Sequence, residues 1–140
     1  MKIYLDIDET ILSNNIKVVE GKMVWDNGIA RHLKEFLEHI LNNHDVYWLT
    51  THCNGDATRP MFYLMDKIPQ DIFQLLMRLK PTKWSVAKTE GIDLDDDFLW
   101  FDDMLSPLEE EALKEAGKLN SHVKVNLDED PDIFKRYLNI

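Results

Sequence analysis

Contiguous apolar runs and helix-spaced apolar positions alternate along the chain. Short runs typical of buried strands lie at residues 2–7, 45–50, 98–101 and 122–126. Helical spacing covers residues 29–42, 60–67, 70–79, 106–118 and 131–139, and residues 82–91 have room for one or two helical turns. Strands that alternate with helices predict an α/β fold, a three-layer α/β/α sandwich with helices on both faces of a parallel sheet.

Residues 16–25 interrupt this alternation with two short β-like runs on either side of Glu20-Gly21. Two such runs around a glycine-containing pair predict a β-hairpin. After the hairpin, the apolar positions take up helical spacing from Ile29 onward. The four tryptophans fit core or rim positions better than a binding site, and Trp25, within the hairpin, is the best candidate among them for a substrate contact.

The composition is that of a chain with one domain and a substantial core. The sequence has 140 residues, 44% of them hydrophobic, which predicts a single domain over residues 1–140. It has no apolar run of about 18 residues, so we expect no transmembrane helix and no membrane partner. The chain enters its first strand without the leader of a secretory signal, and a single cysteine, Cys53, fits a reducing compartment. We therefore expect a cytoplasmic protein.

The net charge of −10 limits the classes of molecule that the protein is expected to bind. A surface that binds nucleic acids in general is basic, so this balance argues against general nucleic-acid binding. It leaves room for a phosphorylated substrate, because a bound divalent cation and one or two placed lysines reverse the local field. We expect the acidic run from Asp93 to Asp97 to be a solvated loop.

Polar side chains follow three of the predicted strands. Asp6 and Asp8 come at the end of the first strand, where residues i and i+2 point to the same face. The second strand ends in Thr50, and the third ends in Asp102-Asp103. In an open α/β sheet, ligands bind outside the carboxyl ends of the strands, so we expect these groups to meet there.

Phosphoryl transfer is the chemistry that these groups can share. Asp6 is placed to attack phosphorus and form an aspartyl-phosphate. Asp8 is placed to protonate the leaving group and then to activate the water that breaks the intermediate. Thr50 would donate a hydrogen bond to a phosphoryl oxygen, and Lys88, before the third strand, would neutralise charge on the nucleophile and the phosphate.

A divalent cation is expected among these acidic groups. Like charges crowded at a strand end repel each other, and a cation makes the arrangement tolerable. Mg²⁺ prefers oxygen ligands in octahedral geometry. We expect its ligands to be Asp6, the backbone carbonyl of Asp8, and one of Asp102 and Asp103, with waters completing the shell.

These motifs, in this order, resemble those of the haloacid dehalogenase (HAD) superfamily. The family's first motif is an apolar strand followed by Asp-x-Asp-x-Thr, which Asp6, Asp8 and Thr10 match. The second is an apolar strand that ends in Thr or Ser, here Thr50. The third motif is a lysine at the start of a helix. The fourth is an apolar strand that ends in an acidic pair, here Asp102-Asp103, and the four motifs together span residues 2–103. The resemblance implies a Rossmann-like sheet, a Mg²⁺-dependent hydrolase of phosphate monoesters, and a hairpin flap over the phosphate site.

The third and fourth motifs each leave a choice of residue. Lys80, Lys83 and Lys88 all lie in the window of the third motif. We prefer Lys88, because it begins a segment that resembles a short capped helical turn before the third strand, and Lys80 is second choice. By resemblance, Asp103 fits the usual metal-ligand position, and Asp102 would support it or the lysine.

One position departs from the family pattern. Glu9 stands where glycine is common, between the second Asp and the Thr of the first motif. A side chain is tolerated there if the backbone angle is ordinary.

The segment lengths leave no room for a sizeable cap domain. About forty residues separate Asp8 from Thr50, and the hairpin and a helix use them. The residues between Thr51 and Lys88 suffice for two short helices but not for an independent domain. By resemblance, such an open site goes with large phosphorylated substrates, or with partner proteins that close the site. Thr51 and His52 are the candidate substrate contacts.

Other functions fit parts of the pattern. A phosphorylatable receiver domain also combines acids, Thr and Lys on a parallel sheet, but its acid pair comes first in the chain, whereas here the pair is last. A 2-haloacid dehalogenase generally lacks the second Asp, and Asp8 is present. The main alternative to a phosphatase acting through Asp6 is a catalytically silent, HAD-like binding or regulatory protein.

Overall fold

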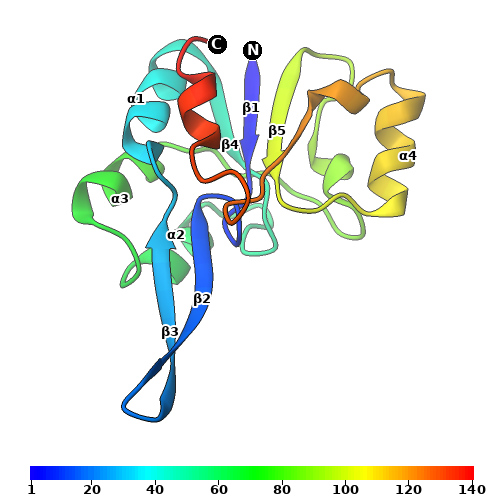
Figure 1. The fold of residues 1–140 in the computed structure, drawn as a ribbon. Coiled ribbons are helices and arrows are strands. Elements are labelled where there is room, and N and C mark those ends of the chain that lie inside the picture. The colour runs from blue at the N-terminus through cyan, green and yellow to red at the C-terminus, as the bar shows by residue number, and fades with distance from the viewer.

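Four parallel strands form the central sheet of the computed structural model, in the order β4-β1-β5-β6 (Figure 1). These strands are β1 (Lys2–Leu5), β4 (Asp45–Trp48), β5 (Phe98–Asp102) and β6 (His122–Lys124). β1 is an inner strand, with Leu5 opposite Trp48 of β4 on one side and opposite Phe101 of β5 on the other. The predicted α/β class with a parallel sheet is confirmed.

β2 (Leu12–Val19) and β3 (Lys22–Ile29) form an antiparallel hairpin that extends away from the sheet (Figure 1). The turn lies where it was predicted, at Glu20 and Gly21, whose φ angles are 51° and 77°. Positive φ at both turn residues matches the twist of the flanking strands. The strands are longer than predicted, because pairing continues to Leu12 opposite Ile29.

The structure describes residues 1–140, apart from the side chains of residues 16–17 and 25–27. The expected substrate contact at Trp25 therefore lies outside the described residues. Among the residues that are described, no helix combines the length and the hydropathy needed to cross a membrane.

Every segment with predicted helical spacing contains a helix, although each helix is shorter than predicted. The α-helices are α1 (Leu33–Asn43), α2 (Thr58–Leu64), α3 (Gln70–Leu76) and α4 (Pro107–Glu115). Three short 3₁₀ helices are η1 (Lys88–Gly91), η2 (Leu119–Ser121) and η3 (Ile133–Tyr137). The helix predicted from Ile29 begins later because that residue ends β3, and the last predicted helix is of the 3₁₀ type.

Apolar side chains are buried on both faces of the sheet. Ile3 and Leu5 of β1 pack in one core with residues of α1, α3 and η3. Tyr4 points the other way and packs in a second core with Trp100 of β5 and Leu113 of α4. Strand side chains alternate between faces, so α1, α3 and η3 cover one face and α4 covers the other (Figure 1). Burying each such large side chain contributes roughly 1.5–3 kcal/mol, so both faces hold the sheet in place.

The order of the strands places a topological switch point at β1. The chain passes from β1 to β4 on one side and later to β5 on the other side. A crevice forms outside the carboxyl ends of the strands at such a point, and ligands bind in it. Asp6, Thr50 and Asp102 lie at or just beyond the ends of these three strands.

Candidate active site

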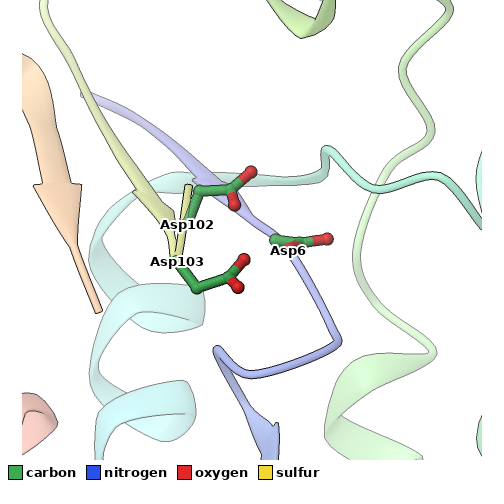
Figure 2. Close-up of side chains that lie close together, drawn as sticks. All are labelled: Asp6, Asp102 and Asp103. Atoms are coloured by element: carbon green, nitrogen blue, oxygen red, sulfur yellow. The ribbon is translucent and has the colours of Figure 1, made fainter. Parts of the chain in front are cut away.

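Three carboxylates from two neighbouring strands meet at the switch point, as Figure 2 shows. One oxygen each of Asp6, Asp102 and Asp103 lies within 4.8 Å of the other two. The strand register explains the meeting, because Leu5 lies opposite Phe101 and the next residues are Asp6 and Asp102. The backbone N–H of Asp6 donates to the carbonyl of Phe101 at 3.1 Å, which extends the pairing one residue past β1.

Burial raises the pKa values of all three carboxyl groups in this cluster. Burial raises the pKa of Asp102 to about 6, and the charge of Asp6 adds to the effect. Burial also raises the pKa of Asp103 to about 6, together with a hydrogen bond to Asp102. Burial raises the pKa of Asp6, although Lys88 and a hydrogen bond from Thr50 act in the other direction. A cation among these oxygens would remove the repulsion.

Lys88, the first residue of η1, is the predicted lysine that reaches the cluster. Its Nζ lies 2.6 Å from Oδ2 of Asp102 and 3.4 Å from Oδ1 of Asp6. Burial alone would lower the pKa of Lys88, but the charges of Asp6 and Asp102 outweigh burial and raise it, so the side chain stays charged. Lys80 instead pairs with Asp45 at the surface, at 3.1 Å.

A capping box at the start of α4 holds the backbone of Lys88. Oγ of Ser106 accepts from the N–H of Glu109, and Oε1 of Glu109 accepts from the N–H of Ser106 at 3.0 Å. The second oxygen of Glu109, Oε2, accepts from the backbone N–H of Lys88 at 2.8 Å. The buried carboxylate of Glu109 thus links the first turn of α4 to the first residue of η1.

Thr50 and Thr51 follow β4 and differ in their contacts. Thr50 is fully buried, its side chain hydrogen-bonds Asp6, and its hydroxyl accepts from the N–H of His52 at 3.3 Å. Thr51 lies at the wall of a cavity of about 330 Å³ above the acidic cluster. The cavity is lined by Asp6, Asp8, Thr51, Lys88, Asp102, Asp103, Met104, Ser106 and Glu109.

The carboxylate of Asp8 is held by three side chains outside the acidic cluster. Oδ1 accepts from Nδ2 of Asn14 at 2.7 Å and from the hydroxyl of Tyr63 at 2.6 Å. Oδ2 lies 2.7 Å from Nε2 of His52. The bond with His52, followed by those with Tyr63 and Asn14, lowers the pKa of Asp8 to about 2 despite partial burial. Asp8 is therefore an ionised acceptor in this arrangement.

The ring of His52 stacks on the ring of Tyr63, with 3.7 Å between centroids and 17° between planes. Burial and the bond to Asp8 raise the pKa of Tyr63, so its hydroxyl stays protonated and donates. Nζ of Lys67 lies 4.5 Å from the Tyr63 ring centroid and donates to the Tyr63 carbonyl at 2.9 Å. His52, predicted as a substrate contact, is thus engaged with Asp8 and α2.

The backbone at Glu9 is not ordinary. Its φ is 58°, in the left-handed region that favours glycine, so the condition for an easily tolerated side chain is not met. Two local hydrogen bonds hold Glu9 in this conformation. The N–H of Glu9 donates to the carbonyl of Leu12 at 2.7 Å, and Oε1 accepts from the N–H of Asn14 at 2.9 Å.

Three residues of the site were not found from the sequence. Glu109 had a local signal, since Ser followed three positions later by Glu is the pattern of a capping box. Asn14 and Tyr63 had none, because their bonds to Asp8 depend on how the hairpin and α2 pack against the end of β1.

The donor set of the cluster fits a divalent cation that prefers oxygen. Carboxylates of Asp6, Asp102 and Asp103 supply hard oxygen ligands from a partly buried position. The carboxylate of Asp8 is bonded to Asn14, Tyr63 and His52 and is not part of this donor set.

No protein-family model matches the sequence. Among curated proteins, the chain is similar to Multidrug resistance protein 4 of Entamoeba histolytica, with 30% identity over 79 residues. The match covers 56% of this chain and 6% of the length of that protein. So short a match leaves the family of the chain open and says nothing about the acidic site.

Proposed function

We propose that the chain is a Mg²⁺-dependent phosphatase of the HAD type that hydrolyses phosphate monoesters through an aspartyl-phosphate on Asp6. The observation that supports this most is the convergence of Asp6 with Lys88 and with the oxygens of Asp102 and Asp103. A nucleophilic carboxylate then lies beside a buried cationic side chain and a set of metal-binding oxygens, which is what phosphoryl transfer needs.

In the first step, a carboxylate oxygen of Asp6 attacks phosphorus, and the bond between phosphorus and the leaving oxygen breaks. The negative charge of the bound phosphate favours the protonated form of Asp8, and in that form Asp8 gives a proton to the leaving oxygen. Lys88 Nζ, 3.4 Å from Asp6, stabilises the charge on the transferred group, while the hydroxyl of Thr50 holds the attacking carboxylate of Asp6 in place. The product alcohol is released, and the phosphoryl group stays on Asp6.

In the second step, Asp8 takes a proton from a water molecule that attacks the phosphoryl group. The acyl-phosphate bond breaks, inorganic phosphate leaves, and Asp6 is again a free carboxylate. Mg²⁺, held by Asp6, Asp103 and the carbonyl of Asp8, would neutralise charge on the phosphoryl oxygens. The bond between Asp102 and Lys88 gives Asp102 a supporting role.

The hairpin of β2 and β3 serves as the flap of this site, since it follows β1 directly and its Asn14 touches Asp8. α2 and α3 occupy the segment between the second and third motifs, where a larger family member would carry a cap. We infer an uncapped site that accepts a phosphorylated group on a large molecule.

A catalytically silent, HAD-like binding protein is the second candidate, and one observation favours it. Three hydrogen-bond partners lower the pKa of Asp8 to about 2, and so acidic a group rarely carries a proton near neutral pH. A site of this kind could bind a phosphorylated partner without turning it over.

Hydrolysis of phenyl phosphate separates the two candidates. We expect turnover with Mg²⁺, none with EDTA, and a loss of at least about 10³-fold in Asp6→Asn, because the nucleophile is gone. Asp95→Asn is the matched control, since it makes the same change in an exposed loop. Unchanged turnover in Asp6→Asn would refute the mechanism, and a folded wild type without any turnover would favour the silent protein.

A further inference from the structure

Asp8 presents two carboxylate oxygens with different surroundings. We propose that Tyr63 and Asn14 are positioning residues that fix Oδ1 of Asp8, so that Oδ2 is the oxygen that gives the proton to the leaving group. This inference rests on the proposed phosphatase function, and it assigns the proton to one atom and the alignment to two side chains from separate elements.

The contacts of Oδ1 leave it no room for a proton. The Tyr63 hydroxyl, at 2.6 Å, and the Asn14 amide nitrogen, at 2.7 Å, both donate to it. An amide NH₂ group only donates, and a proton on Oδ1 would oppose that donor and force the Tyr63 hydroxyl to turn. Oδ1 therefore acts as a fixed acceptor, anchored to β2 on one side and to α2 on the other.

The partner of Oδ2, His52, can form a hydrogen bond with the protonated or the ionised form of the carboxyl group. It lies 2.7 Å from Nε2 of His52, and an imidazole nitrogen can accept from a protonated oxygen or donate to an ionised one. The ring of His52 is held by its stack on Tyr63, at 3.7 Å between centroids. Tyr63 thus orients both Asp8 and the side chain that faces Oδ2.

The proton balance of the reaction follows from this assignment. As the bond between phosphorus and the leaving oxygen breaks, the O–H bond at Oδ2 also breaks, and the proton moves to the leaving oxygen. Asp8 is left as a carboxylate with Oδ1 still bound to Tyr63 and Asn14. The attacking water later returns a proton to Oδ2.

The consequence is a dependence on the leaving group. A phenolate with strong electron withdrawal departs without a proton, whereas an alkoxide needs one. Loss of the alignment at Oδ1 therefore slows hydrolysis of an alkyl phosphate far more than hydrolysis of p-nitrophenyl phosphate. A general loosening of the fold would slow both substrates alike.

The test compares Tyr63→Phe with wild type on p-nitrophenyl phosphate and glycerol 2-phosphate, with Mg²⁺ present. Phenylalanine keeps the stack on His52 and removes only the hydroxyl. We expect kcat to fall at least about tenfold for glycerol 2-phosphate and less than about threefold for p-nitrophenyl phosphate, with KM little changed. Tyr4→Phe is the control, because that hydroxyl accepts from the N–H of Asp93, at 3.4 Å, and contacts neither Asp8 nor His52 among the described residues.

Asn14→Ala removes the other donor to Oδ1 and is a second test. It should also lower kcat more for glycerol 2-phosphate than for p-nitrophenyl phosphate. Equal losses for both substrates, or no loss for either, would overturn the inference while leaving the phosphatase function in place. A folded wild type that hydrolyses neither substrate would instead overturn the phosphatase function, and the inference with it.

Discussion

Nζ of Lys88 lies 2.6 Å from Oδ2 of Asp102, and the two side chains are only 12% and 2% exposed. This pair joins the start of η1 to the end of β5 in the wall of the cavity. Because Asp6 and Asp103 lie beside it, the lysine is the positive charge that the described side chains bring to a group of three carboxylates. We therefore expect the stability of the fold and the proposed chemistry of the site to depend on the same contact.

Replacing the lysine should destabilise the metal-free protein. Lys88→Met leaves buried carboxylates without a counter-charge, and we expect a loss of roughly 3 kcal/mol in the free energy of unfolding at pH 8. Urea denaturation with EDTA measures it. Lys80→Met, which breaks an exposed pair with Asp45, should cost less than about 1 kcal/mol. Equal losses in the two variants would show that the buried pair contributes no more than a surface one.

Removing one carboxylate should weaken cation binding. Asp103→Asn takes a charge and a hard oxygen ligand from the cluster, so we expect the Kd for Mg²⁺ to rise at least about tenfold in calorimetric titration. Asp95→Asn alters the net charge equally in an exposed loop and should leave the Kd almost unchanged. Matching values for the two variants would place the cation elsewhere.

The sequence was a good guide where local pattern decides the structure. The apolar runs before Asp6, Thr50 and Asp102 predicted three strands that the structure confirms, and a parallel sheet brings strand ends to one edge. The element boundaries were less accurate, since Ile29 continues the hairpin ladder rather than starting α1. Pairing between strands decided that boundary, and helical spacing alone does not reveal pairing.

The hydrogen-bond partners of Asp8 could not be predicted from the local sequence pattern. Its partners Asn14 and Tyr63 are far apart in the chain and meet only because the hairpin and α2 both pack near the end of β1. The backbone at Glu9 is a related case. Its left-handed φ of 58° is set by bonds to Leu12 and Asn14, and a glutamate gives no local signal for that conformation.

His122, a half-buried histidine on β6, should make the stability of the protein depend on pH. Burial lowers the pKa of His122 to about 4, and its ring lies edge-on to Trp100 at 4.8 Å. The unfolded chain takes up the proton near pH 6.5, so the stability that the neutral ring contributes is complete above that pH and is lost as the pH falls towards 4. We expect the free energy of unfolding of the wild type to change more unfavourably over this range than that of His122→Gln.

The comparison with His122→Gln is needed because other groups titrate in the same range. The raised pKa values of Asp102 and Asp103, about 6, stabilise the fold as the pH falls, which opposes the effect of the histidine. Urea denaturation of both proteins between pH 7 and pH 4.5 isolates the imidazole. Parallel curves for the two proteins would contradict its assignment as a half-buried neutral group.

The charge around the cavity should select the substrate. Among the described side chains that line it, five are acidic and Lys88 is the only cationic one. Mg²⁺ and Lys88 would offset part of this charge, so the site should disfavour a leaving group that carries further phosphates. We expect a phosphoserine peptide with flanking lysines to have a kcat/KM at least about tenfold above that of a 5′-phosphorylated oligonucleotide at low salt.

The same substrate preference should shrink as salt is added, because screening weakens interactions between separated charges. A peptide with flanking glutamates is the matched control, since it keeps the phosphoserine and reverses the neighbouring charge. If the oligonucleotide were the better substrate, the acidic lining would have no part in specificity.

Binding of beryllium fluoride, a mimic of the phosphoryl group on a carboxylate, tests the central role of Asp6 most directly. Fluorine NMR of the protein with beryllium fluoride should show a bound resonance that requires Mg²⁺ and is missing in Asp6→Asn. It should persist in Asp95→Asn, which keeps the cluster intact. A bound resonance that survives in Asp6→Asn, or its absence in a folded wild type with Mg²⁺, would contradict the assignment of Asp6 as the phosphoryl acceptor.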